Sequence, residues 1–109
     1  RNPMGWLDFF RRPDINAGVE DWMGTPGAVL LDVRTPAEYG EGHIPGSRNV
    51  PLDGLDQVRA LAPDQETPLF AYCLSGSRSR HAAALLRRMG YQHVTNIGGI
   101  SGYRGKVES

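Results

Sequence analysis

The 109-residue sequence contains one cysteine, no excess of charge of either sign and no long hydrophobic run. Its single cysteine, Cys73, cannot form a disulfide within the chain, which favours a reducing compartment and a working thiol. Twelve basic residues balance twelve acidic ones, so no overall field recruits nucleic acid or an anionic membrane. No apolar run approaches the roughly 18 residues of a membrane span, and no secretory signal pattern opens the chain. We therefore expect a cytoplasmic protein that binds neither nucleic acid nor membranes.

Length and composition predict one folded domain, which we expect to be a monomer. A chain of this length buries a core without disulfides or metal ions, and 39% apolar residues is typical of a folded protein. Residues 1–3 precede the first methionine, Met4, and are interpreted as a remnant of an expression vector, which leaves residues 4–109 as the domain. The apolar residues between positions 6 and 10 are expected to pack on the domain's own core, with a partner surface as the alternative. They are Trp6, Leu7, Phe9 and Phe10.

Residues 68–89 change their hydrophobic period from that of a strand to that of a helix. Residues 69–72 are a short, continuous apolar run, as in a buried parallel strand. From Arg78 onward, apolar residues recur at the helical spacing, and Gly90 stands in the position of a helix C-cap. The apolar residues of this stripe are Ala82, Leu85, Leu86 and Met89. Cys73 therefore lies in a loop between a strand and the N-terminus of a helix.

This position is suited to an ionised thiol. The first N–H groups of a helix have no internal partners and favour negative charge, and Arg78 and Arg80 follow closely. We expect the pKa of Cys73 to lie below the free-cysteine value of about 8.5, which makes the thiol a nucleophile near neutral pH. The intervening residues are mostly small, so their backbone N–H groups can turn inward around the sulfur. The alternative is a buried cysteine that serves only as a small apolar residue.

The rest of the chain alternates strands with helices. Strands are expected over residues 28–33, 47–50 and 93–97, and helical segments over residues 17–23, 53–61 and 100–104. Asn16 is expected to cap the first helix, and Thr35 with Glu38 predicts a capping box at a helical turn that begins at Pro36. This order predicts a three-layer α/β domain whose central, mostly parallel sheet is flanked by helices. Ligands of such sheets bind outside the carboxyl ends of the strands, where Cys73 lies.

The loop from Cys73 to Ser79, Cys-Leu-Ser-Gly-Ser-Arg-Ser, resembles the active-site loop of the rhodanese family, C-x-x-G-x-R-S. Further segments resemble that family in the same order, over about residues 28–105. They are Leu31-Asp-Val-Arg34, Glu38-Tyr39, Gly42-His-Ile-Pro-Gly46, Asn49-Val-Pro51 and Gly98-Gly99 followed by Tyr103. Two positions depart from the family pattern, since Ser47 stands where alanine is usual and Tyr103 where tryptophan is usual. Both are interpreted as packing variants.

The resemblance implies a rhodanese-like fold and a sulfurtransferase activity. Such an enzyme moves a sulfane sulfur from thiosulfate or a persulfide donor to cyanide or a thiol acceptor, through a persulfide on the catalytic Cys73. The remaining loop residues would bind the donor sulfur, and they are Leu74, Ser75, Gly76, Ser77, Arg78 and Ser79. No metal or organic cofactor is implied, and a protein is an alternative acceptor. We expect Arg78 to orient the loop rather than to attract the anionic donor.

Four polar residues outside the loop are interpreted as supports of the fold. They are Asp32, Arg34, Glu38 and His43. The first three lie near the carboxyl end of a strand, where a structural polar network is expected. His43 occupies a tight turn in which its ring satisfies nearby backbone groups, and His81 is expected to face outward. Three isolated histidines do not predict a metal site.

Two other classes of function remain open. A phosphatase or arsenate reductase of related fold also uses a cysteine and an arginine in one loop, but places five residues between them. Here four residues separate Cys73 from Arg78, which makes a smaller ring suited to a single sulfur atom. The second alternative is a non-catalytic module that senses redox state or binds a partner. The intact cysteine loop argues against a binding module, whereas the sequence leaves the redox sensor open.

Overall fold

In a computed structural model, which describes residues 12–109, four parallel strands form the central sheet in the order β2-β1-β3-β4. The strands are β1 (Val29–Asp32), β2 (Arg48–Asn49), β3 (Leu69–Cys73) and β4 (Val94–Gly99). All five residues of β3 are buried because β1 and β4 pair with it on either side and helices cover both faces. The continuous apolar run therefore forms the centre of the sheet.

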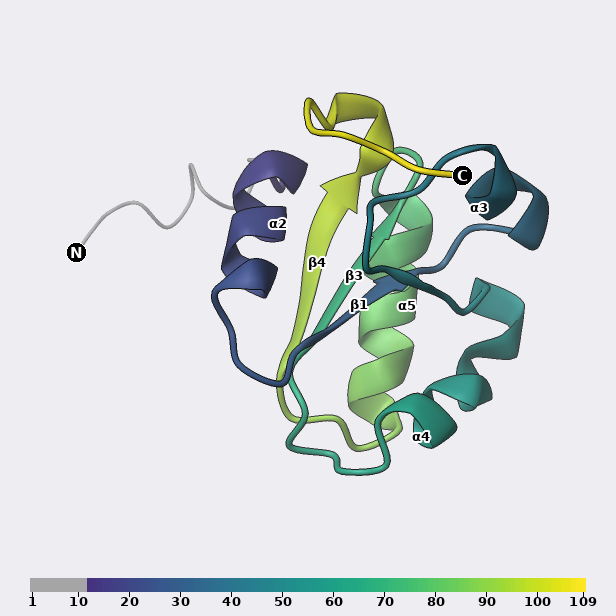
Figure 1. The fold of residues 1–109 in the computed structure, drawn as a ribbon. Helices are drawn as coiled ribbons and strands as arrows, with labels where there is room; N and C mark the ends of the chain where they lie inside the picture. The colour runs from purple at the N-terminus through teal and green to yellow at the C-terminus, as the bar shows by residue number, and fades with distance from the viewer. Residues whose placement is uncertain (1–11) are drawn as a thin grey trace.

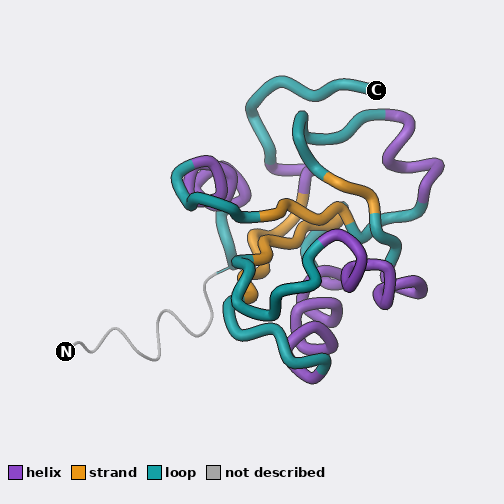
Figure 2. Tube along the Cα trace, turned by 60° about the horizontal axis from the view of Figure 1, so that its bottom comes forward, coloured by secondary structure: helices purple, strands orange, loops and turns teal. Residues whose placement is uncertain are grey.

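Helices cover both faces of the sheet, so the predicted three-layer α/β architecture is confirmed (Figures 1 and 2). On one face lies α2 (Ile15–Met23), which packs on a cluster that includes Leu30, Phe70 and Ile97. On the other face lie α5 (Ser77–Arg88), the 3-10 helix η1 (Leu52–Gln57) and the short α4 (Val58–Leu61). Their apolar residues share a second cluster with Leu31, Ala71 and Cys73. Neighbouring residues of one strand alternate between these clusters, as the pleat requires.

The predicted stripe of α5 is present, whereas its C-cap is Met89, one residue before the predicted Gly90. Ala82 and Leu86 are fully buried, whereas Leu85 and Met89 are partly buried at the edge of the same cluster. Gly90 follows the helix with φ of 108°, a left-handed conformation that glycine adopts without a steric penalty.

Of the two predicted helix N-caps, one is confirmed and one is wrong. Thr35 caps α3 (Pro36–Glu41) with the predicted capping box, in which its side chain accepts from the Glu38 N–H and the Glu38 carboxylate accepts from the Thr35 N–H. Helix α2 begins two residues earlier than expected, because Asp14 rather than Asn16 is its N-cap. The Asp14 carboxylate accepts the Asn16 N–H at 3.0 Å. Both residue types favour this position, so the sequence alone does not separate them.

The predicted helix over residues 53–61 is divided. Gly54 has non-helical backbone angles, φ of −127° and ψ of 34°, so the segment forms η1 and then the single turn α4. Leu55 and Val58 of the expected stripe are nevertheless buried, and Leu61 is partly buried. The strand expected over residues 47–50 pairs only at Arg48 and Asn49. At the C-terminal end, the 3-10 helix η2 (Ile100–Gly102) is shorter than the expected turn over residues 100–104.

Two interpretations fall outside the described residues, namely the vector remnant at residues 1–3 and the packing of the aromatic segment at residues 6–10. None of the helices in the described part of the chain has the length and hydrophobicity that crossing a membrane requires.

Candidate active site

The Cys73 sulfur lies at the carboxyl end of β3 and accepts hydrogen bonds from the loop that follows. The Gly76 N–H donates to Sγ at 3.0 Å and the Ser79 N–H at 3.4 Å, while the Ser79 hydroxyl lies 3.5 Å away. The residue exposes no surface, and its side chain forms part of the apolar cluster beneath α5. The cysteine is thus buried as the alternative interpretation requires, but its sulfur faces polar hydrogens, as the functional interpretation requires.

Two glycines give the loop its shape. Gly76, the residue before α5, has φ of 106°, which residues with a side chain rarely adopt. Gly99 has ordinary extended angles, φ of −123° and ψ of 138°, but a Cβ atom there would overlap the backbone of Leu74 and Ser75. The Ser101 N–H also donates to the Leu74 carbonyl at 3.1 Å. The end of β4 therefore supports the Cys73 loop through direct backbone contact.

The hydrogen bonds outweigh burial in setting the charge of the thiol. Burial disfavours the thiolate and by itself would raise the pKa of Cys73. The hydroxyl and N–H of Ser79 and the N–H groups of Gly76 and Ser75 act in the opposite direction, and the net effect holds the pKa of Cys73 below its ordinary value. Cys73 is thus a buried thiol that the loop predisposes to ionise.

The beginning of α5 offers further donors. Within α5, the Ser79 N–H donates to Cys73 Sγ and the Arg80 N–H donates to the Gly76 carbonyl at 3.1 Å. Among residues 12–109, neither the Ser77 nor the Arg78 N–H donates a hydrogen bond. These two N–H groups belong to the first turn of a helix, where the macrodipole favours negative charge. The site therefore has donors beyond those that already hold Sγ.

Asn96 is a site residue that sequence reasoning missed. Its Oδ1 accepts the Ser79 hydroxyl at 2.7 Å and the Gly98 N–H at 3.0 Å. The Gly98 N–H identifies Oδ1 as an acceptor, so Asn96 competes for the single Ser79 proton with Cys73 Sγ and with the carbonyl oxygens of Gly76 and Gly98. Asn96 lies on β4 where its register against β3 shifts by one residue. The only sequence signal was its position two residues before Gly98-Gly99.

Both terminal nitrogens of the Arg78 guanidinium point to the Glu38 carboxylate. Nη1 and Nη2 donate to the two carboxylate oxygens of Glu38 at 2.8 and 2.9 Å. Hydrogen bonds from Arg78 and then from the Thr35 N–H lower the pKa of Glu38 from about 4.5 to about 2. The structure thus brings together two residues that the sequence analysis placed in different groups, a loop residue and a support residue.

The other expected supports form their own network. Arg34 donates to both carboxylate oxygens of buried Asp32 and to the Gly42 carbonyl, at 2.7 to 3.1 Å. The His43 ring stacks on Tyr39 with centroids 3.7 Å apart, and its Nδ1 lies 2.8 Å from the Tyr39 carbonyl oxygen. Within the described residues, none of these side-chain hydrogen bonds reaches the Cys73 loop.

No metal centre is indicated in the part of the chain that the structure describes. Residues 12–109 contain no group of three or more histidine, cysteine, aspartate or glutamate side chains placed to hold an ion. His81 is exposed on α5, as expected, and His93 lies 3.1 Å from Glu66 at the surface.

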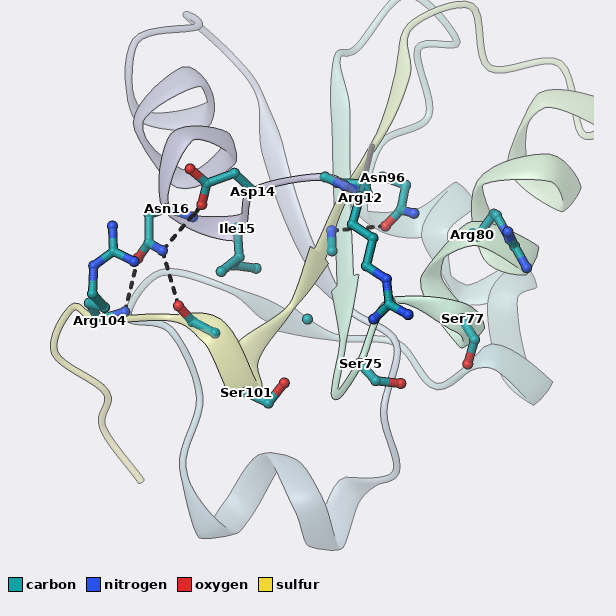
Figure 3. Close-up of a pocket in the computed structure, with 15 residues that line it drawn as sticks. Arg12, Asp14, Ile15, Asn16, Ser75, Ser77, Arg80, Asn96, Ser101 and Arg104 are labelled. Carbon is teal, nitrogen blue, oxygen red and sulfur yellow. Dashed lines mark hydrogen bonds between the residues drawn. The ribbon is translucent and has the colours of Figure 1, made fainter. Parts of the chain in front are cut away.

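A pocket of about 500 Å³ opens directly beside the loop (Figure 3). Its lining combines loop residues with both ends of the described chain, since Arg12 and Asn16 come from the start and Arg104 from the end. Ser75, Gly76 and Ser77 form the side next to Cys73. The sequence analysis singled out neither Arg12 nor Arg104, because neither belongs to a motif.

Comparisons with known proteins agree with this geometry. A family model described as "Rhodanese-like domain" matches residues 16–106. The thiosulfate sulfurtransferase PspE of Escherichia coli is 37% identical over 71 residues, which are 64% of this chain and 68% of PspE. The thiosulfate sulfurtransferase GlpE of Stutzerimonas stutzeri is 37% identical over 92 residues, 84% of this chain and 81% of GlpE. A solved structure described as "rhodanese with anions from E. coli" has a TM-score of 0.71 at 31% identity, covering 75% of this chain and 98% of that one.

Proposed function

The chain belongs to the rhodanese-like domain family, and from this premise we propose that it is a sulfurtransferase that carries sulfane sulfur as a persulfide on Cys73. The donor is thiosulfate or a low-molecular-weight persulfide, and the acceptor is cyanide in an assay or a thiol in a cell. The observation that carries the proposal is the Cys73 sulfur held by the N–H groups of Gly76 and Ser79. These bonds favour the thiolate, which is the nucleophilic form of cysteine. The relatives named thiosulfate sulfurtransferase support the same reaction class.

In the first step, the Cys73 thiolate attacks the outer sulfur of thiosulfate. A bond forms between Sγ and that sulfur, the S–S bond of thiosulfate breaks, and sulfite leaves with the bonding electron pair. The protein then carries Cys73–S–S⁻. The N–H groups of Ser77 and Arg78, which donate to no described residue, are the donors assigned to the outer sulfur, in the way that an oxyanion hole stabilises oxygen.

In the second step, the acceptor attacks the outer sulfur. For a thiol, the acceptor reacts as its thiolate, the bond between Sγ and the outer sulfur breaks, and Cys73 leaves as a thiolate. A thiolate of low pKa is a better leaving group, so the hydrogen bonds from Gly76 and Ser79 assist this step as well. The donor product leaves before the acceptor reacts, which gives ping-pong kinetics. The cycle requires one chain, no cofactor and a compartment that keeps Cys73 reduced, for which we propose the cytoplasm.

Two features favour sulfur transfer over phosphate hydrolysis. Four residues lie between Cys73 and Arg78, one fewer than in the phosphatases considered above. The Arg78 guanidinium is held by Glu38, so it is not directed at an anion inside the loop. An arginine that binds a phosphoryl group needs its planar fork free for the oxygens. Arg78 is accordingly assigned to positioning the loop.

The experiment is a pair of turnover assays on the wild type and Cys73→Ser. We expect thiocyanate to form from thiosulfate and cyanide with the wild type and not with the variant, and we expect no Cys73-dependent cleavage of an aryl phosphate. Replacing thiosulfate with mercaptopyruvate or glutathione persulfide identifies the preferred donor. Cys73-dependent phosphate release without thiocyanate would show a phosphatase, and a thiol that only gains oxygen after peroxide treatment would show a redox sensor.

A further inference from the structure

The pocket beside the Cys73 loop has an excess of positive charge that the whole chain lacks. Three arginines line it, Arg12, Arg80 and Arg104, whereas Asp14 is the only acidic residue in the described lining. The Asp14 carboxylate is already engaged as the cap of α2, where it accepts the backbone and side-chain N–H groups of Asn16 at 3.0 and 3.2 Å. Since the chain as a whole has a formal net charge of zero, the positive potential is a local property of this pocket.

The arginines are not equivalent. In Figure 3, the Arg12 side chain extends toward Ser75, Arg80 points outward from α5, and Arg104 stands on the opposite side of the pocket beside Asn16. The Arg104 N–H donates to Asn16 Oδ1 at 2.9 Å, which fixes the backbone of this residue next to α2. Arg12 therefore lies on the side of the pocket next to the Cys73 loop, and Arg104 lies across the pocket from it.

The size of the pocket argues against thiosulfate as its only occupant. A volume of about 500 Å³ lies within the range of sites for organic ligands, roughly 300 to 1,000 Å³, whereas thiosulfate has five heavy atoms. The donor sulfur needs only the N–H groups of the loop, which do not depend on Arg12 or Arg104. A ligand that reaches both arginines must instead extend across the pocket.

We propose that this pocket selects the acceptor, and that the acceptor is a small thiol with a carboxylate on each side of its sulfur. The two carboxylates pair with Arg12 and Arg104, and the thiol between them reaches the outer sulfur of the Cys73 persulfide above Ser75 and Gly76. Arg12 and Arg104 are then specificity-determining residues outside the catalytic loop. The inference rests on the proposed function, because it assumes that Cys73 carries a persulfide for the thiol to attack.

The reaction with such a thiol balances without a further reactant. The thiol loses its proton to solvent, its sulfur forms a bond to the outer sulfur, and the bond between that sulfur and Cys73 Sγ breaks. Cys73 leaves as a thiolate and the acceptor departs as its own persulfide. The carboxylates take no part in these bonds, so the two arginines act on the binding of the acceptor.

The test uses glutathione and its diethyl ester, which have the same sulfur but free or blocked carboxylates. The protein is first loaded with sulfur from thiosulfate, and the rate constant for sulfur removal is measured with each thiol for the wild type, Arg12→Gln, Arg104→Gln, the double variant and Arg88→Gln. Arg88 is exposed near the end of α5 and does not line the pocket, so Arg88→Gln is the matched control. The ratio of the two rate constants within one variant cancels differences in loading.

We expect the wild type to prefer the free acid. Each substitution in the pocket should lower the ratio about threefold and the double variant about tenfold, as for exposed charge pairs, and Arg88→Gln should keep the wild-type ratio. The preference should also weaken as salt rises from about 0.05 to 0.5 M, because exposed charges are screened.

An unchanged ratio in a double variant that still takes up sulfur would overturn the inference. Slower uptake from thiosulfate in that variant with an unchanged ratio would assign the pocket to the donor, and would overturn it also. If the wild type takes up no sulfur from any donor, the proposed function itself is wrong, and the inference about the acceptor is lost with it.

Discussion

Arg78 and Glu38, forty residues apart in the chain, are joined by two short hydrogen bonds of 2.8 and 2.9 Å. Glu38 also accepts the N–H of Thr35, so the same carboxylate caps α3 and anchors the first turn of α5. Paired charges in this bidentate geometry are stronger than single contacts between surface charges. The pair therefore connects the Cys73 loop to α3, the helix that follows β1 in the sequence. This contact assigns Arg78 a role in positioning the loop.

We predict that Arg78→Ala and Glu38→Ala impair sulfur uptake by Cys73 to a similar extent, about tenfold, because each leaves the loop without the same anchor. The double variant should be no slower than either single variant, since the two residues act as one unit. Stopped-flow or quench measurements of persulfide formation from thiosulfate provide the rates. If Arg78 instead binds the donor, Arg78→Ala will raise KM for thiosulfate whereas Glu38→Ala will not.

The same ion pair predicts how stability depends on acid. The pKa of Glu38 is about 2 in the folded protein and about 4.5 without its partners. Above about pH 4.5 the pair contributes its full stabilisation, and this contribution is lost as the pH falls through the folded value near 2. Denaturant unfolding at pH 6 and pH 3 should therefore show a smaller loss of unfolding free energy in Glu38→Gln than in the wild type. Equal losses would mean that the pair is not formed in solution.

Ser79 should set the pH at which Cys73 becomes reactive. Its hydroxyl and N–H lower the pKa of Cys73 against the opposing effect of burial. The rate of sulfur uptake follows the thiolate fraction, so its midpoint should lie below that of an ordinary cysteine, and Ser79→Ala should move it upward and slow uptake at pH 7 about fivefold. Normalising each profile to its plateau at high pH separates the pKa from any loss of loop geometry. A midpoint that does not move would show that the hydroxyl donates to its oxygen acceptors, such as Asn96 Oδ1 and the Gly76 carbonyl, and not to the Cys73 sulfur.

Sequence periodicity was sufficient to predict strand β3, helix α5 and the loop between them, because the burial of each element determines where its apolar residues recur. The run at β3 is apolar throughout since both faces of this strand are covered, and the stripe of α5 has one buried face. The choice between two neighbouring residues for the N-cap of α2 could not be made from the sequence. Asp14 and Asn16 are both good caps, and the structure adds that the Asn16 side chain bonds instead to the backbone of Gly102 and Arg104, 86 and 88 residues away.

A substitution at Gly99 tests whether the backbone contact between β4 and the Cys73 loop determines the shape of that loop. Its dihedral angles suit any residue, but a Cβ would overlap the backbone of Leu74 and Ser75, so Gly99→Ala should displace the loop and reduce sulfur uptake at least tenfold. Overpacking of this kind costs about 1–3 kcal/mol of stability. Gly40→Ala is the matched control, because its Cβ would meet no atom within 4 Å and its position is helical. Wild-type rates in Gly99→Ala would mean that the loop does not depend on this contact.

The parts of the site that the sequence did not reveal come from long-range contacts. Asn96 joins the site through the Ser79 hydroxyl, 17 residues away, and Arg12 and Arg104 meet at the pocket although they lie near opposite ends of the chain. Arg12 and Arg104 belong to no periodic pattern or short motif, and the only signal for Asn96 is its position two residues before Gly98-Gly99. Their proximity follows from the parallel order of the strands, which brings distant loops to one edge of the sheet.

The central claim, that Cys73 holds a transferable sulfur, is tested most directly by the intact mass of the protein after incubation with thiosulfate. We predict a gain of one sulfur atom that maps to Cys73, disappears on addition of cyanide with release of thiocyanate, and does not occur in Cys73→Ser. Persistence of the unmodified mass with thiosulfate, mercaptopyruvate and glutathione persulfide alike, in a protein whose Cys73 still reacts with iodoacetamide, would contradict the claim.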